Sequence, residues 1–98
     1  MSKCRSLDEV RIQIDRLDAQ IVALLSERSG YVAQAAAFKP RVDDVVVPER
    51  IEAVIRNVRA HALLHDADPD LLEAIYRPMI AAFIAFERQQ WRKTRGDT

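Results

Sequence analysis

The spacing of apolar residues near the start of the chain constrains the fold more than any other feature. Apolar residues recur at intervals of mostly three and four: Leu7, Val10, Ile14, Leu17, Ile21, Leu24, Tyr31, Ala35 and Phe38. This pattern is the seam of a long amphipathic helix. Ser6 and Glu9 form a capping box at its start, and Pro40 excludes helical geometry for the residue before it. We therefore predict a helix of roughly thirty residues, about 45–50 Å long.

A helix of this length does not fit inside a compact domain made from one chain of 98 residues. A globular chain of that size would have a radius of gyration of ~13 Å. The apolar seam therefore needs a partner, and we expect a homodimer intertwined along this helix. Residues 1–98 are expected to form a single domain, since the chain is near the lower size limit for burying a core alone.

Two shorter helices are predicted after residues 40–47, which we expect to form a loop because a lone strand would have nothing to pair with. Pro48 suits the first turn of the second helix, whose apolar stripe comprises Ile51, Val54, Ile55, Val58 and Ala62. Asp68 and Pro69 begin the third helix, which Pro78 should bend. Its inward residues are expected to be Leu72, Ile75, Met79, Ile80, Phe83, Ile84 and Trp91, and the charged tail after them should fray. The predicted fold class is all-α.

Composition excludes several classes of function. Lys plus Arg and Asp plus Glu both number 15, so no basic field suggests a nucleic-acid partner. We expect no membrane association, because no apolar run is long enough to span a bilayer. Cys4 is the single cysteine, which fits a reducing cytoplasm. His61 and His65 lie one turn apart without a third ligand nearby, so no metal site is expected.

Arg28 occupies the seam position between Leu24 and Tyr31, where a leucine would be typical. A buried cation is costly unless an anion meets it. Lys39 follows eleven residues later, about three helical turns and ~20° from the same face. With small Ala35 between them, the two cations predict a pocket for a small anion. The alternative is that Arg28 leaves the seam and pairs with an acid of the partner helix.

Glu87 is also charged at a position predicted to point inward. It follows Ile80 and Phe83 on one stripe of the third helix, and these two residues would form apolar walls of the pocket. Either an arginine neutralises this carboxylate, or it is protonated beside a bound anion and donates a hydrogen bond. No serine, cysteine or lysine has an obvious activating base. The pattern favours a reaction in which the protein holds a dianion and stabilises charge in the transition state.

Arg11 and Glu49 are two further candidates with ordinary alternatives. Arg11 lies seventeen residues before Arg28, ~25 Å along the helix, so the two cannot share a small ligand within one chain. In an antiparallel dimer, Arg11 of the partner subunit would lie beside Arg28. Otherwise Arg11 pairs with Asp15 on the surface. Glu49 opens the second helix, where its charge also complements the helix dipole.

These features resemble the all-helical chorismate mutase family over residues 7–95. The resemblance rests on Val10 to Asp18, Leu24 to Arg28, Phe38-Lys39 and Pro48-Glu49-Arg50. It implies an intertwined helical dimer with two equivalent sites. Each site would convert chorismate to prephenate by a Claisen rearrangement without a cofactor.

The resemblance also implies roles for individual residues. Arg28 and Lys39 would bind the substrate carboxylate and ether oxygen, and Arg11 of the partner subunit would complete the site. Glu49 matches a glutamate that contacts the substrate hydroxyl. Glu87 falls where many bacterial members have glutamine and fungal members have glutamate, which donates to the ether oxygen beside the lysine.

Two other interpretations remain beside the favoured mutase. The related isochorismate-pyruvate lyases share the fold and the cations, and the stretch Val47-Pro48-Glu49-Arg50 and the ending at residues 91–96 are more similar to theirs. Familiar bacterial mutases have arginine where this chain has Pro48, whereas Glu87 favours the mutase. An amino-substituted chorismate is a third possible substrate. A non-catalytic helical dimerisation module would instead pair Arg28 with an acid across the seam and leave no cavity.

Overall fold

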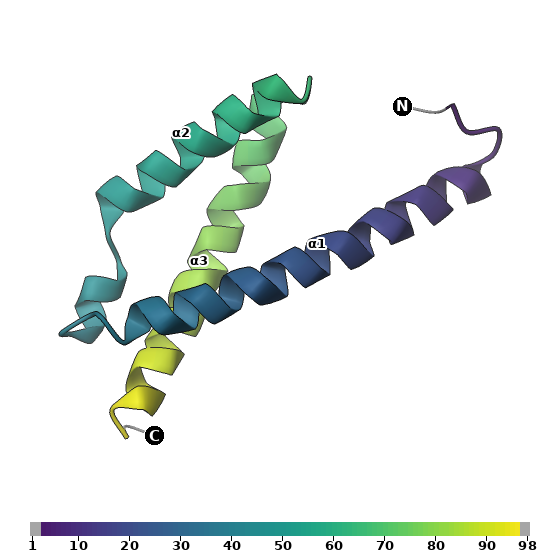
Figure 1. Ribbon diagram of the computed structural model, residues 1–98. Coiled ribbons are helices and arrows are strands. Elements are labelled where there is room, and N and C mark those ends of the chain that lie inside the picture. Colours follow the sequence, from purple (N-terminus) through teal and green to yellow (C-terminus); the bar gives the residue numbers. More distant parts are fainter. Residues whose placement is uncertain (1–2, 97–98) are drawn as a thin grey trace. The chain divides into compact units, whose positions relative to one another are not determined.

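The structure is a computed structural model that describes residues 3–96. Its elements are three α-helices and one 3₁₀ turn, namely α1 (Leu7–Ala36), η1 (Val42–Val45), α2 (Pro48–Leu64) and α3 (Pro69–Thr94) (Figure 1). Within residues 3–96 there is no strand, so the predicted all-α class with a long first helix is confirmed. None of the helices in this part of the chain is long and apolar enough to cross a membrane.

The start of α1 agrees with its predicted cap. Ser6 Oγ accepts a hydrogen bond from the Glu9 N–H at 3.1 Å, as an N-cap hydroxyl does. The Glu9 carboxylate was expected to reach back to the Ser6 N–H, but it accepts from the Arg5 N–H at 2.6 Å. Asp8 and Glu9 in the first turn complement the positive end of the helix dipole.

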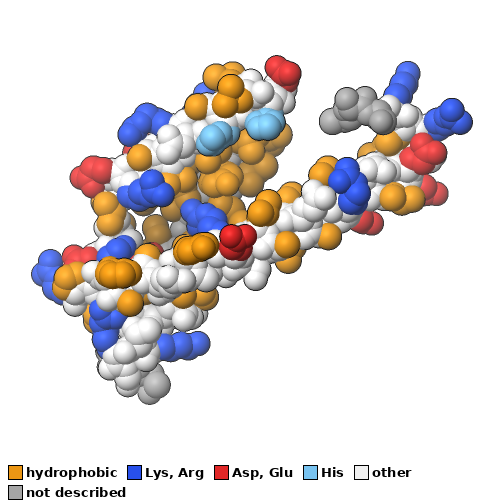
Figure 2. Space-filling model, in the orientation of Figure 1, with side chains coloured by type: hydrophobic (Ala, Val, Ile, Leu, Met, Phe, Trp, Pro, Cys, Tyr) orange, Lys and Arg blue, Asp and Glu red, His pale blue; other side chains and the backbone are white. Residues whose placement is uncertain are grey.

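The chain divides into a first unit that ends at Tyr31 and a second that begins at Val32. In the first unit, the apolar seam of α1 is open to solvent in the single chain. The apolar seam residues from Val10 to Tyr31 are between 38% and 65% exposed, and Figure 2 shows apolar side chains spaced along this helix. Such a continuous exposed stripe is typical of a surface that another protein surface covers.

In the second unit, α2 and α3 pack against each other as a helical hairpin (Figure 1). The turn that reverses the chain is a Schellman motif at the end of α2. Ala67 N–H donates to the Ala62 carbonyl at 2.8 Å and Asp66 N–H to the Leu63 carbonyl at 3.3 Å. Asp66 has a φ of 57°, a left-handed conformation that aspartate tolerates better than most residues with a side chain.

The predicted starts of α2 and α3 are both confirmed. Pro48 and Pro69 lie in the first turns of their helices, where a missing N–H costs nothing. Asp68 Oδ1 caps α3 by accepting from the Asp70 N–H at 2.9 Å. The third helix continues through Pro78 without interruption.

The core of the second unit is thin. Five apolar residues among those described are buried: Ala36, Val45, Ile55, Ala62 and Ile80. Val45 belongs to η1, which packs against α3. Ile75 was predicted to point inward but is 51% exposed in the single chain. The next residue, Tyr76, takes the position facing α2 instead, because consecutive helical residues point about 100° apart.

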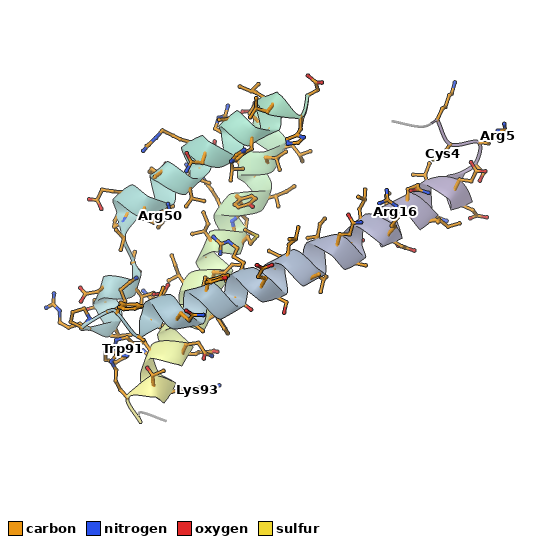
Figure 3. The ribbon with its side chains drawn as sticks, viewed as in Figure 1. Cys4, Arg5, Arg16, Arg50, Trp91 and Lys93 are labelled. Carbon is orange, nitrogen blue, oxygen red and sulfur yellow. The ribbon has the colours of Figure 1, made fainter. Side chains whose placement is uncertain are left out.

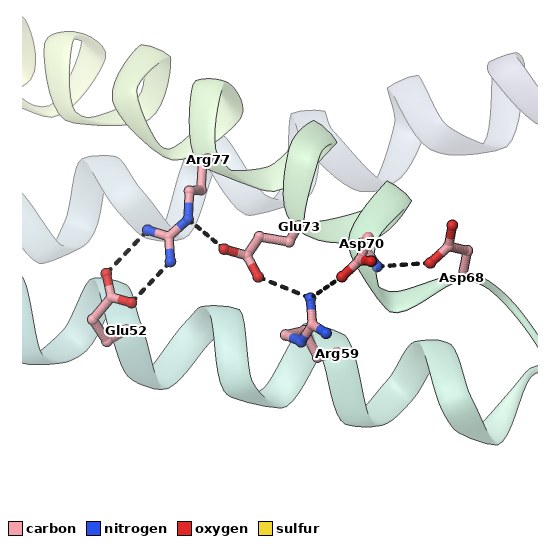
Figure 4. A network of polar contacts seen from close by, with 6 residues as sticks. All are labelled: Glu52, Arg59, Asp68, Asp70, Glu73 and Arg77. Atoms are coloured by element: carbon pink, nitrogen blue, oxygen red, sulfur yellow. Dashed lines mark hydrogen bonds and ion pairs between the residues drawn. The ribbon is translucent and has the colours of Figure 1, made fainter.

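Ion pairs join α2 to α3 in a continuous network (Figure 4). The Arg77 guanidinium forks onto the two Glu52 oxygens at 3.0 and 2.9 Å, and its Nε donates to Glu73 at 2.7 Å. Arg59 Nη1 donates to Glu73 at 2.9 Å and to Asp70 at 3.0 Å. Glu73 therefore bridges two arginines, and the bidentate fork of Arg77 fixes the register of the two helices.

The network lowers the pKa of two of its carboxyl groups, those of Glu52 and Glu73. The hydrogen bond from Arg77 lowers the pKa of both Glu52 and Glu73, and this outweighs the raising effect of desolvation. Hydrogen bonds to Glu52 and then Glu73 raise the pKa of Arg77 in return. When folding lowers the pKa of a carboxyl group, the resulting stabilisation is present at pH values above the group's ordinary pKa. It is lost as pH falls through the pKa of the group in the folded state.

We therefore expect Arg77→Gln to destabilise the protein near pH 7 and to have a diminishing effect below about pH 4. Arg77 and Glu52 are exposed and Glu73 is half-buried, so the difference in the free energy of unfolding should be small and should decrease further with added salt. Urea unfolding of wild type and variant from pH 7 to pH 3.5 measures it. Arg50→Gln, which removes an exposed arginine of α2 outside the network, is the control. An Arg77→Gln effect that stays constant over this range would contradict the prediction.

Candidate functional site

Lys39 lies in the turn that follows α1, which corrects its predicted place on the helix. The N–H groups of Phe38 and Lys39 donate to the carbonyls of Ala35 and Ala36 at 3.1 and 3.2 Å. These i to i+3 bonds tighten and close the last turn. The helix ends at Ala36, so Lys39 is not on the helical face that the sequence spacing implied. Pro40 contributes to this ending, because it disfavours helical geometry at Lys39 and has no N–H to donate to the Ala36 carbonyl.

The Lys39 side chain reaches α3. Its Nζ lies 3.0 Å from Oε2 of Glu87, a charge-assisted hydrogen bond. Glu87 is 8% exposed and is the only charged residue that is buried among residues 3–96. The predicted inward position of Glu87 is therefore confirmed, but the cation beside it is a lysine and not an arginine.

The last turns of α3 also bind the backbone of Lys39. Trp91, labelled in Figure 3, donates from Nε1 to the Lys39 carbonyl at 2.8 Å, and Arg95 Nη2 donates to the same oxygen. We expected Trp91 only as a core residue, the third helix to run to about Arg95, and the charged tail from residue 92 onward to fray. The helix ends at Thr94, in agreement with its predicted end, whereas Arg95 makes defined contacts. Residues 97–98 of the tail lie outside the described residues.

Apolar residues surround Glu87 on its own helix. Ile80 and Phe83 precede it by seven and four residues and share its face of α3. Ile80 is buried, and Phe83 is half-buried with its ring edge-on to Phe86 at a centroid distance of 6.4 Å. Ala35, in the last turn of α1, is half-buried. The carboxyl group of Glu87 therefore belongs to an otherwise apolar stripe, as the sequence predicted.

Glu49 lies exposed in the first turn of α2, directly after Pro48. Its charge complements the helix dipole there. Arg50, which Figure 3 labels, follows in the same turn. Contact between Glu49 and a substrate hydroxyl stays a prediction.

The two other predicted cations lie on α1 in the first unit of the chain. Arg11 is exposed and Arg28 is half-buried. Their contribution to the site stays a prediction from the sequence.

A groove of about 420 Å³ opens between α2 and α3 near the turn that connects them. Apolar residues, two histidines and a tyrosine line it: Val58, His61, Ala62, His65, Ala67, Leu72 and Tyr76. Figure 2 shows the apolar surface between these two helices. Within residues 3–96 no group of three His, Cys, Asp or Glu side chains is placed to hold a metal ion. The groove is separate from Lys39 and Glu87, which do not line it.

The pair of Lys39 and Glu87 can bind a small polar molecule in two ways. The lysine ammonium has three N–H donors, so it can keep its bond to Glu87 and still donate elsewhere. The carboxyl group accepts hydrogen bonds when ionised and donates one when protonated. Donors fixed in place beside apolar walls are well suited to stabilise negative charge that develops on an oxygen atom during a reaction.

Comparison with known proteins gives two findings. The family described as chorismate mutase type II matches residues 10–88, which include both Lys39 and Glu87. An isochorismate pyruvate lyase of Pseudomonas aeruginosa is 33% identical to the chain over 93 residues. That alignment covers 95% of this chain and 92% of the relative.

Proposed function

We propose that this chain, which belongs to the chorismate mutase type II family, converts chorismate into prephenate at a site built on Lys39 and Glu87. The family match and the relative make it an enzyme of the chorismate mutase or isochorismate pyruvate lyase type. The observation that supports this choice of site is the 3.0 Å bond between Lys39 and the buried carboxyl of Glu87. It places a cation and a second polar group on an otherwise apolar stripe of α3.

The rearrangement needs charge stabilisation and a folded substrate, and it needs no nucleophile. The ether C–O bond breaks while the enolpyruvyl methylene forms a new C–C bond to the ring, and no proton is transferred. Negative charge accumulates on the ether oxygen as its bond to the ring lengthens. In this proposal the Lys39 ammonium donates a hydrogen bond to that oxygen, and the bond strengthens in the transition state.

Glu87 would act beside Lys39 as a second donor to the ether oxygen. An ether oxygen has no hydrogen to donate, so a carboxyl group can bond to it only when protonated. In the productive complex Glu87 is proposed to be neutral, with Lys39 turned toward the substrate oxygen.

Arginine side chains are proposed to hold the two substrate carboxylates. Arg28 would bind one of them with its planar fork, which matches a carboxylate bidentately. Arg11 of the partner subunit would bind the other. Glu49 would contact the substrate hydroxyl, and Ala35, Ile80 and Phe83 would line the apolar walls.

A homodimer is part of the same proposal. The exposed seam of α1 and the thin core of the second unit leave much apolar surface open in the single chain. A second copy of the chain, with its own seam, is the partner that would cover it. Obligate dimers of this kind often have no stable folded monomer.

Isochorismate-pyruvate lyase activity is the second candidate. The 33% identical relative carries that name, and the stretch Val47-Pro48-Glu49-Arg50 resembles the lyases. This reaction also breaks an ether C–O bond, while a hydrogen of the ring passes to the enolpyruvyl methylene, so that pyruvate and the aromatic product salicylate are released. The same lysine would stabilise the same oxygen, so the two reactions differ in the substrate that the site selects.

Identification of products separates these candidates. The purified protein, incubated separately with chorismate and isochorismate, is expected to form prephenate from chorismate with the higher kcat/KM. Lys39→Ala should lower kcat by at least ~10², as removal of one oxyanion donor does. Lys93→Ala, at an exposed lysine near the end of α3, should leave it unchanged. Faster salicylate and pyruvate formation would assign the lyase activity. No turnover of either substrate would favour a non-catalytic dimerisation module.

Mixing of inactive subunits tests the shared site. Arg11→Ala and Arg28→Ala homodimers should each be nearly inactive, since each lacks one carboxylate-binding arginine in both sites. After subunit exchange, a heterodimer would carry both substitutions in one site and none in the other, so each heterodimer should have about half of a normal dimer's activity. Exchange is verified by mass spectrometry of differently tagged subunits. Heterodimers as inactive as their parents would rule out a site shared between subunits.

A further inference from the structure

Three side chains at the end of α3 contact the residue that is proposed to be catalytic. Glu87 and Trp91 lie four residues apart on one face of α3, and Arg95 is the C-cap residue that follows the helix. Glu87 binds the Lys39 ammonium at 3.0 Å. Trp91 Nε1 binds the Lys39 carbonyl at 2.8 Å, and Arg95 Nη2 donates to that carbonyl as well.

The backbone of Lys39 is thereby bound on both sides. Its N–H donates to the Ala36 carbonyl at 3.2 Å. Its carbonyl oxygen has two lone pairs, and Trp91 and Arg95 each donate to it. The following residue, Pro40, has no N–H that could bond to α1 in their place. The bonds from α3 therefore decide where the backbone of this turn lies.

Arg95 makes two further contacts here, one with the Ala36 carbonyl and one with the Trp91 ring. Its Nη1 donates to the Ala36 carbonyl at 3.4 Å, at the negative end of the α1 dipole, where a cation is favourable. Its guanidinium carbon lies 4.3 Å from the centroid of the Trp91 ring, within the range of a cation–π contact. The ring and the guanidinium thus support each other while both hold the Lys39 carbonyl.

We propose that Trp91 and Arg95 are positioning residues that aim Lys39 by holding its backbone against the helix that carries Glu87. The catalytic role of Lys39 rests on the proposed function, whereas its position can be measured without substrate. A lysine side chain has four rotatable bonds, so its ammonium can hold one position beside Glu87 only if its backbone is also held in place. Loss of either donor would let the turn move away from α3 and would displace the ammonium from the reacting oxygen.

The first test measures the position of Lys39 in the free protein. The chain has three lysines, Lys3, Lys39 and Lys93, so ¹⁵N-lysine labelling gives few side-chain ammonium signals, and Lys39→Ala assigns the one from Lys39. In wild type that signal should be slowed in hydrogen exchange by its bond to Glu87. Trp91→Phe keeps an aromatic ring without the donor, and it should abolish this protection, as should Arg95→Ala.

Arg92→Ala is the matched control, because it removes an exposed arginine from the same last turn of α3. It should leave the Lys39 signal unchanged. If Lys39 stays equally protected in folded Trp91→Phe and Arg95→Ala, the positioning role is overturned. Circular dichroism of each variant establishes that it is folded before its signal is compared.

The second test asks whether the two residues act through Lys39. Trp91→Phe and Arg95→Ala should each lower kcat between about 10-fold and 100-fold, as small misplacements of catalytic groups do, with little change in KM. In a Lys39→Ala background the same substitutions should have almost no further effect, because residues that act through one another are not additive. Equal losses in both backgrounds would show a general structural effect and overturn the proposal. If wild type converts neither chorismate nor isochorismate, the proposed function fails, and the lysine signal alone decides the positioning role.

Discussion

The bond between Lys39 and Glu87 joins the end of α1 to α3 and ties the local fold of the second unit to its chemistry. Placing charges in a mostly apolar surrounding is costly, and removal of one partner leaves the other without compensation. A pair in such a place is weak evidence of added stability, since apolar residues of similar size would often serve as well. The presence of this pair on an apolar stripe is better explained by a functional role. Such a role would also explain why several residues at the end of α3 bond to Lys39.

The sequence predicted the features that depend on local rules. These are the all-α class, the caps at Ser6 and Asp68, the two helix starts at proline, and the inward position of Glu87. Apart from the proximity of Glu87 to Lys39, which the family resemblance implied, it did not predict contacts between residues far apart in the chain. The bonds from Trp91 and Arg95 to Lys39 and from Arg77 to Glu52 depend on how the helices pack, which helical periodicity does not specify. The place of Lys39 was wrong because the helix ended earlier than the continued pattern implied, although Pro40 was a visible reason.

The small core and the exposed seam have a common physical cause. A chain of 98 residues that devotes 30 of them to one helix has few residues left to cover that helix. Five buried apolar side chains among the described residues are few for a domain of this size. An assembly of two chains would supply the missing coverage, and it would also explain why a cation such as Arg28 occupies a seam position. Stability and a substrate site would then be built from the same surface.

The proposed chemistry depends most on the protonation state in which Glu87 acts beside Lys39. The dependence of kcat/KM on pH between 5 and 8, compared for wild type and Glu87→Gln, measures it most directly. A protonated donor is lost as pH rises, so wild-type activity should fall toward pH 8. The glutamine amide donates at every pH, so the variant should have a flat profile and should equal or exceed wild type at pH 8. A wild-type profile that rises with pH, or a glutamine variant inactive throughout, would show that Glu87 acts as a carboxylate and would contradict the account.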